Sequence, residues 1–168
     1  YDPEGITYDP TSHDLFIADG LNAEVYRVNA GANGIFDGIA AVGGDDIVTS
    51  FDSLALGVED PEGIYFDTSS GHLFMTGKSV TTLFELTTAG VVLQTYDVST
   101  ANAVKFGSLT FGPSSEDANR TSIYIADRRI DNNSDPAEND GLIYEFSTLL
   151  AAPTPTPVAT LSILPFAD

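Results

Sequence analysis

Apolar, β-branched and aromatic residues gather in short runs along this chain, and Gly, Asp, Asn and Ser separate the runs. Runs of this kind, bounded by turn residues, predict β-strands, and no stretch keeps a helical period over a dozen residues. The clearest predicted strands are residues 5–10, 15–19, 25–28, 47–52, 83–86, 92–97, 108–113, 123–127 and 143–146. The pattern therefore predicts an all-β fold.

The predicted strands belong to an internal repeat. Residues 2–6, Asp-Pro-Glu-Gly-Ile, recur as residues 60–64, and half of the aligned positions from 2 to 19 are identical to their partners in 60–77. A weaker third copy covers residues 108–127. A repeat built of four short strands is typical of a propeller blade. The sequence predicts β-propeller-type, four-stranded antiparallel blades, about three of them, in an incomplete ring.

The expected organisation is a repeat region at residues 1–148, with blades at about 1–58, 59–103 and 104–148. A Pro/Thr-rich spacer at 149–157 and a C-terminal strand at 158–168 follow. Because propellers use about four to eight blades, three blades leave open edges. Either the chain is part of a longer protein, or copies close each other, or a neighbouring chain supplies strands. The C-terminal strand could pair with its own third blade or with a neighbour, and we expect a homo-oligomer or a filament.

Charge narrows the classes of partner. The chain carries 25 acidic and 6 basic residues, a formal net charge of −19. Nucleic acid is not an expected partner, because phosphate contacts need clustered Lys and Arg. Membrane insertion is not expected either, since no apolar run approaches the length of a transmembrane span. The absence of cysteine excludes disulfides and thiolate chemistry.

Two acidic loops are candidate calcium sites, because calcium binds several convergent carboxylate and amide oxygens. The richer loop offers Asp127, Asp131, Asn133, Asp135, Glu138 and Asp140. The thinner loop offers Asn33, Asp37, Asp45 and Asp46. The alternatives are a solvated acidic loop with Arg128 and Arg129 as counterions in the first case, and a Gly/Asn turn in the second.

Glu4 and Glu62 occupy matching Asp-Pro-Glu-Gly turns before the innermost strand of a predicted blade. In a propeller this turn lies beside the central channel, where two carboxylates could converge on a cation or ligand. The alternative is that they satisfy backbone donors of the turn. No catalytic residue is predicted, because there is no Gly-x-Ser-x-Gly motif, and His13 and His72 fall in the same turn of two repeats.

The chain resembles bacterial secreted propellers related to NHL-type repeats and to phytase-like esterase domains, which are often found in calcium-binding surface proteins. The resemblance rests on residues 60–64 and 73–75, on Ser-Ile-Tyr-Ile-Ala-Asp at 122–127, on 138–145, and on the Gly-rich insertion at 31–38 with 44–46. It covers about residues 1–148. It implies a propeller repeat, calcium as a cofactor, and an extracellular or cell-surface location.

From these observations we expect a non-enzymatic, extracellular structural or adhesive module. Calcium would stabilise it, and it would self-associate through open blade edges and the C-terminal strand, as in a surface fibre. Two alternatives are a calcium-dependent, phytase-like phosphoesterase fragment with Glu4 and Glu62 as channel ligands, and a ligand-free scaffold domain of a larger secreted protein.

Overall fold

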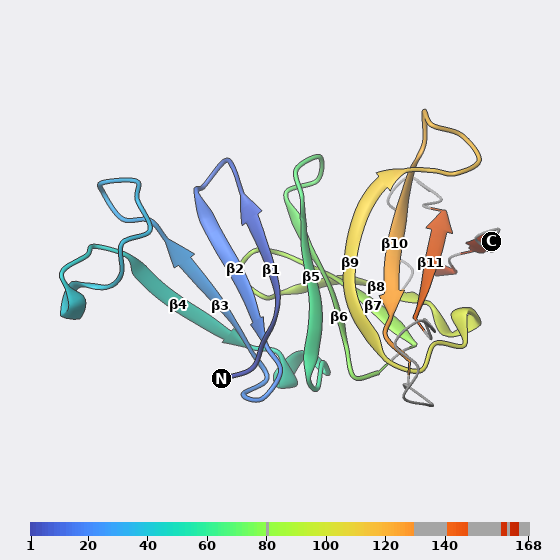
Figure 1. The fold of residues 1–168 in the computed structure, drawn as a ribbon, viewed down its shortest axis with the longest axis horizontal. Helices are drawn as coiled ribbons and strands as arrows, with labels where there is room; N and C mark the ends of the chain where they lie inside the picture. The colour runs from blue at the N-terminus through green and yellow to red at the C-terminus, as the bar shows by residue number, and fades with distance from the viewer. Residues whose placement is uncertain (80, 130–140, 148–158, 161, 165–168) are drawn as a thin grey trace.

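The computed structural model describes residues 1–79, 81–129, 141–147, 159–160 and 162–164. In these residues the chain forms three β-sheets, each built on four antiparallel strands, and a short parallel strand extends the second sheet to five (Figure 1). The described part contains three single turns of 3-10 helix and no α-helix. The predicted all-β fold of four-stranded antiparallel units is confirmed at this level.

The first sheet consists of four consecutive strands, β1 (Pro3–Asp9), β2 (Asp14–Asp19), β3 (Glu24–Asn29) and β4 (Ile47–Asp52). The second repeats this order with β5 (Pro61–Asp67), β6 (His72–Gly77), β7 (Thr82–Leu86) and β8 (Val92–Asp97). A two-residue strand, β12 (Ala159–Thr160), lies parallel to β8 at the outer edge of the second sheet. The 3-10 turns η1 (Ala40–Val42), η2 (Leu54–Leu56) and η3 (Ser99–Ala101) lie in the connections.

The third sheet contains β9 (Phe106–Pro113), β10 (Thr121–Asp127), β11 (Leu142–Ser147) and β13 (Ser162–Leu164). Its outer strand comes from the C-terminal segment, and Phe146 of β11 lies opposite Ile163 of β13 in the antiparallel register. The C-terminal strand therefore pairs with the chain's own third sheet. The predicted spacer at 149–157 lies outside the described residues.

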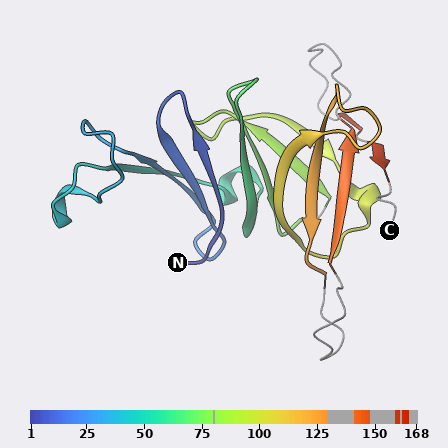
Figure 2. The ribbon, with the colours of Figure 1, turned by 45° about the horizontal axis from the view of Figure 1, so that its top comes forward.

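The three sheets stand side by side with their first strands adjacent, β1 next to β5 and β5 next to β9 (Figures 1 and 2). Glycine allows this close approach. A Cβ on Gly5 would come within 2.9 Å of the Glu62 carbonyl oxygen, and one on Gly63 within 2.9 Å of the Gly107 carbonyl oxygen. Any larger residue would push these strands apart, so the glycine of the repeated motif sets the spacing of the sheets.

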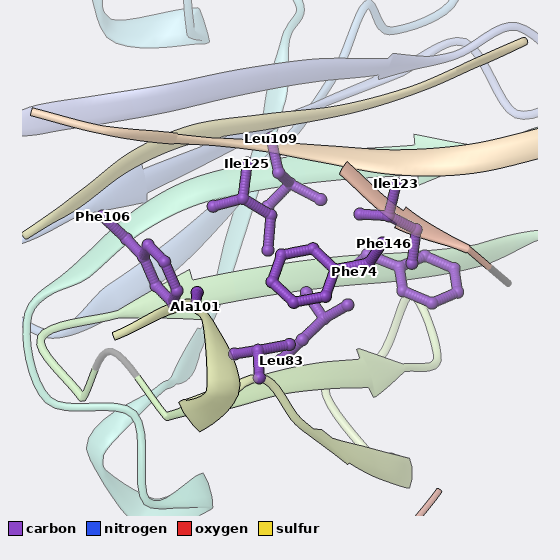
Figure 3. Packing of buried hydrophobic residues seen from close by; sticks show 9 residues of the cluster. Phe74, Leu83, Ala101, Phe106, Leu109, Ile123, Ile125 and Phe146 are labelled. Atoms are coloured by element: carbon purple, nitrogen blue, oxygen red, sulfur yellow. The ribbon is translucent and has the colours of Figure 1, made fainter. Parts of the chain in front are cut away.

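Two hydrophobic cores fill the spaces between neighbouring sheets. The core between the first and second sheets includes Phe16 and Val25 from one side and Ile64 and Met75 from the other. The core between the second and third sheets is drawn in Figure 3, where Phe74, Leu83, Leu109, Ile123, Ile125 and Phe146 point toward one another. Each sheet therefore covers a face of the next one. Because side chains alternate between the two faces of a strand, the middle sheet presents one apolar face to the first sheet and the other to the third.

Candidate functional site

The two repeated glutamates lie in β-bulges at the start of β1 and β5. The strand register shifts between Pro3 and Gly5, and in the same way between Pro61 and Gly63. Glu4 and Glu62 are thus the extra residue of each bulge. A bulge turns a side chain away from the regular alternation of the strand. The repeat therefore aims both carboxylates in the same way.

Arg128, immediately after β10, joins the two glutamates. Its Nη2 donates to Oε2 of Glu62, and its Nη1 lies 3.9 Å from Oε2 of Glu4. The Glu62 side chain is only 3% exposed, whereas that of Arg128 is 42% exposed. We call these three residues the Glu–Glu–Arg cluster. Each of the three sheets contributes one member, so the cluster exists only where the sheets meet.

A glycine makes room for the arginine. By the repeat alignment, Gly107 stands where the first two copies have Glu4 and Glu62. A Cβ on Gly107 would lie 3.1 Å from Cγ of Arg128, tighter than an ordinary contact. The third copy therefore replaces a carboxylate with a cation from the neighbouring strand. Sequence reasoning missed this role of Arg128, which it treated as a counterion within its own loop, although the glycine at position 107 was an available signal.

The environment of Glu62 perturbs its protonation. Burial raises the pKa of this carboxyl group, the cation of Arg128 lowers it, and the negative charge of Glu4 raises it again, with a net shift upward. Desolvation disfavours the ionised form, and a single partly exposed arginine offsets only part of that cost. Nearby, the hydroxyl of Thr76 is buried and has no hydrogen-bond partner among the described residues. The cluster thus combines two carboxylates, one of them buried with a raised pKa, and a cation.

The thinner acidic loop predicted from sequence does come together. Asp37, Asp45 and Asp46 each offer a carboxylate oxygen, and these oxygens lie within 4.8 Å of one another. The Asn33 side chain donates to Oδ2 of Asp37 at 2.8 Å, and Oδ2 of Asp45 accepts from the Ala32 amide at 2.8 Å. Oδ1 of Asp45 and Oδ1 of Asp46 are buried without a hydrogen-bond partner among the described residues.

The richer acidic loop is represented by Asp127 alone. Its carboxylate accepts from the amides of Val104 (3.0 Å), Lys105 (2.8 Å) and Arg129 (3.0 Å), and it is buried. These bonds tie the connection before β9 to the end of β10, a structural role. Its predicted partners lie outside the described residues; they are Asp131, Asn133, Asp135, Glu138 and Asp140.

Comparison with known proteins shows a likeness in fold to solved structures. No family model matches the chain, and no curated protein matches it. The solved structure of a luciferin-regenerating enzyme is similar, with a TM-score of 0.60 and 16% sequence identity. The match covers 88% of this chain and 45% of that protein, so the chain spans less than half of the enzyme's length. In the described residues no helix is long and apolar enough to cross a membrane.

This comparison corrects the expected function. We expected a non-enzymatic structural or adhesive module because the sequence lacks a familiar nucleophile motif. At 16% identity the likeness shows the fold alone, but a protein with this fold is an enzyme. Catalysis on such a scaffold does not need a Ser-His pair, since carboxylates and an arginine can also perform it. The likeness to an enzyme therefore contradicts the prediction of a non-enzymatic adhesive module or fibre subunit.

Proposed function

We propose that the three sheets are adjoining blades of a β-propeller and that the Glu–Glu–Arg cluster is the active site of a hydrolytic enzyme. The observation that carries the proposal is the buried carboxyl of Glu62, with its raised pKa, bonded to an arginine of another sheet. Perturbed carboxyl groups of this kind concentrate at functional sites.

The propeller assignment rests on the order of the strands. Each sheet runs from first to fourth strand outward, and the first strands of all three sheets adjoin. In a propeller the first strands line the central channel. Glu4 and Glu62, at the starts of two such strands, would then face the channel mouth with Arg128, where a small molecule can enter.

The chemistry that fits is general-base hydrolysis of a carboxylic ester. Glu62 accepts a proton from a water molecule as that water attacks the carbonyl carbon, and later returns it to the leaving alkoxide. A raised pKa makes the carboxylate a stronger base at neutral pH. Arg128 carries five N–H donors, so it can hold Glu62 and also stabilise the developing oxyanion. Glu4 supports the base through its negative charge, which raises the pKa of Glu62.

The substrate should be a small, neutral or singly charged ester. Arg128 favours a substrate with an oxygen-rich, electron-withdrawing group beside the carbonyl. The acidic surface of the chain, with a net charge of −19, opposes a highly anionic substrate. These two conditions make uncharged chromogenic esters the first substrates to test.

The experiment measures hydrolysis of a panel of chromogenic esters by the purified protein and by Glu62→Gln. Glutamine keeps the shape of the side chain but cannot accept the proton, so kcat should fall by about 10²–10⁴. The kcat of the original protein should rise with pH as Glu62 ionises.

The matched control is Glu59→Gln. Glu59 lies three residues before Glu62, in the connection that leads into β5; it is exposed and pairs with Lys78 at 3.0 Å. Its substitution should leave kcat unchanged. Turnover that survives Glu62→Gln, or no turnover on any ester, would contradict the proposed activity.

Other expectations from the sequence stay predictions. These are the membership of the secreted bacterial propeller group, the extracellular location, calcium as a cofactor, and the absence of nucleic-acid and membrane partners. Secretion assays of the full gene product and metal analysis of the purified protein would test the location and the cofactor.

A further inference from the structure

Two faces recur in every sheet. One face of the second sheet carries Ile64, Phe66, Leu73 and Met75, and we call this side of every sheet its leading face. The opposite side of every sheet is its trailing face, which in the first sheet carries Phe16, Ala18 and Val25. These two sets pack together in the core between the first and second sheets. The next core repeats the arrangement, with the trailing residues Phe74 and Leu83 against the leading residues Leu109, Ile123 and Ile125. Each interface is thus a trailing face against a leading face.

The leading face of the first sheet is uncovered. Ile6 occupies the repeat position of Ile64 and Leu109, which are 4% and 7% exposed, yet Ile6 is 64% exposed. The strand register places Ile17 and Tyr26 in the same row as Ile6, and a second row contains Tyr8, Leu15 and Val28. The face is therefore a continuous apolar surface without a charged residue in either row, of the kind that marks an interaction site.

The trailing face of the third sheet is uncovered in the same way. Ile143 occupies the repeat position of Val25 and Leu83, which are both fully buried, yet Ile143 is 56% exposed. The register places Ala126 directly opposite Ile143. Within the described part of the chain, Glu145 is the only carboxylate on this face; it is buried and accepts hydrogen bonds from Ser115. Among the described residues, this face therefore offers an apolar centre, and its carboxylate is buried and hydrogen-bonded.

We propose that these two faces bind each other between two copies of the chain, closing a ring of six sheets. The occupant is a second copy because both halves of the repeated interface are present on one chain. In the closed pair the leading face of each copy meets the trailing face of the other, which gives two identical interfaces related by a two-fold axis. The contact uses sheet faces and leaves the strand edges out. The fold likeness agrees with this count, since 88% of this chain matches 45% of the similar enzyme, close to half of that protein.

Pairing also completes the Glu–Glu–Arg cluster. In a half ring the cluster is open on one side, whereas in the closed ring two clusters would surround a common central space. The proposal nevertheless stands on the exposed apolar faces alone and does not depend on ester hydrolysis. Since each copy carries a net charge of −19, association should strengthen as salt screens the repulsion.

The test is the mass of the purified protein by sedimentation velocity at micromolar concentrations, in low and in high salt. The expected mass is twice the chain mass of 17.7 kDa, with the dimer fraction rising with salt. Ile6→Asp and Ile143→Asp, at exposed positions on opposite faces, should each give a folded monomer. The control is Leu54→Asp in η2, which changes an equally exposed apolar residue outside both faces and should leave the dimer intact.

Mixing the two monomeric variants separates this geometry from nonspecific adhesion. A mixed pair places both aspartates in one interface and leaves the other interface unchanged, so mixing should restore part of the dimer. A monomer at every concentration and salt, masses that grow beyond a dimer, or no recovery on mixing would overturn the proposal. Circular dichroism of each variant checks that loss of the dimer is not loss of the fold.

Discussion

Arg128 bonds to the buried carboxylate of Glu62 across the boundary between the third and second sheets. The two residues are 66 positions apart in the chain, and only the side-by-side placement of β5 and β9 brings them together. The pair therefore reports on the packing of whole sheets, and its removal should affect stability as well as any chemistry at the cluster.

Substitution of Arg128 by methionine should destabilise the fold by about 2 kcal/mol near neutral pH, because it leaves Glu62 buried without its cation. This loss of stability is smaller than for a fully buried ion pair, since the arginine side chain is 42% exposed and water can reach the site. Arg128 holds the pKa of Glu62 down, so its removal raises that pKa further. A protonated carboxyl tolerates burial, and the destabilisation should shrink as the pH falls through this raised pKa. Urea unfolding at neutral pH and in mild acid measures both effects.

Arg129→Met is the control for that experiment. Arg129 lies 3.5 Å from the carboxylate of Asp127, but three backbone amides already bind Asp127. Loss of this ion pair should cost less than about 1 kcal/mol. Equal destabilisation by the two variants, or a pH-independent effect of Arg128→Met, would contradict the role given to the Glu62 contact.

Glu145 should make the protein sensitive to acid. Burial by itself would raise the pKa of this carboxyl group, but hydrogen bonds from Ser115 outweigh it and the pKa falls to about 2. Because the folded pKa lies below the ordinary value of 4.5, the ionised group stabilises the fold above that value. This stability is lost as the pH falls from the ordinary value toward about 2.

Ser115→Ala removes the hydroxyl that donates to Glu145 and should cost about 2 kcal/mol near neutral pH. The pKa of Glu145 should rise, and the midpoint of acid unfolding, followed by far-UV circular dichroism, should move to higher pH. Ser108→Ala, at an exposed position of β9, is the control and should leave the midpoint in place. An acid midpoint that Ser115→Ala does not move would show that other bonds determine the pKa of Glu145.

Calcium binding at the loop before β4 is the third prediction. Asp37, Asp45 and Asp46 place carboxylate oxygens within 4.8 Å of one another, and two of their oxygens are buried without partners. A cation would satisfy those oxygens. Isothermal titration with calcium should detect binding, and Asp45→Asn should weaken it by at least about tenfold.

Two further variants locate the calcium site. Asp97→Asn alters an exposed turn that contains no such cluster and should leave calcium affinity unchanged. Asp135→Asn alters the other predicted loop. Affinity lost with Asp135→Asn and kept with Asp45→Asn would assign the ion to residues 127–140, and no binding by the original protein would contradict calcium in either loop.

The strand pattern of the sequence was sufficient to predict most of the sheets. The fourth strands expected at 47–52 and 92–97 are β4 and β8, and the repeated motif at 2–6 and 60–64 predicted matching starts for β1 and β5. These features are local, since each depends on alternation and turn residues within a few positions.

The contacts between sheets were not predictable in this way. Glu4 and Glu62 were recognised because they repeat. Arg128 does not repeat in this way, since the first copy has Gly20 at the matching position. Its role follows from the glycine at position 107 and from the way in which the third sheet packs. The expected function failed for a related reason, because the absence of a short catalytic motif says little about residues that come together only in the fold.

The core between the second and third sheets gives the last prediction. Phe74 is almost fully buried there, with its ring centroid 4.7 Å from that of Phe111, and it points into the cluster drawn in Figure 3. Phe74→Ala should lower the free energy of unfolding by about 3–5 kcal/mol, because it removes a large buried ring and leaves a cavity. Val91→Ala, at an exposed turn position of the second sheet, should change it by less than about 0.5 kcal/mol. Chemical denaturation measures both.

Since Phe74 bridges two sheets, its loss should also weaken the bond between Arg128 and Glu62. Phe74→Ala and Arg128→Met together should therefore lower the free energy of unfolding by less than the sum of their separate effects.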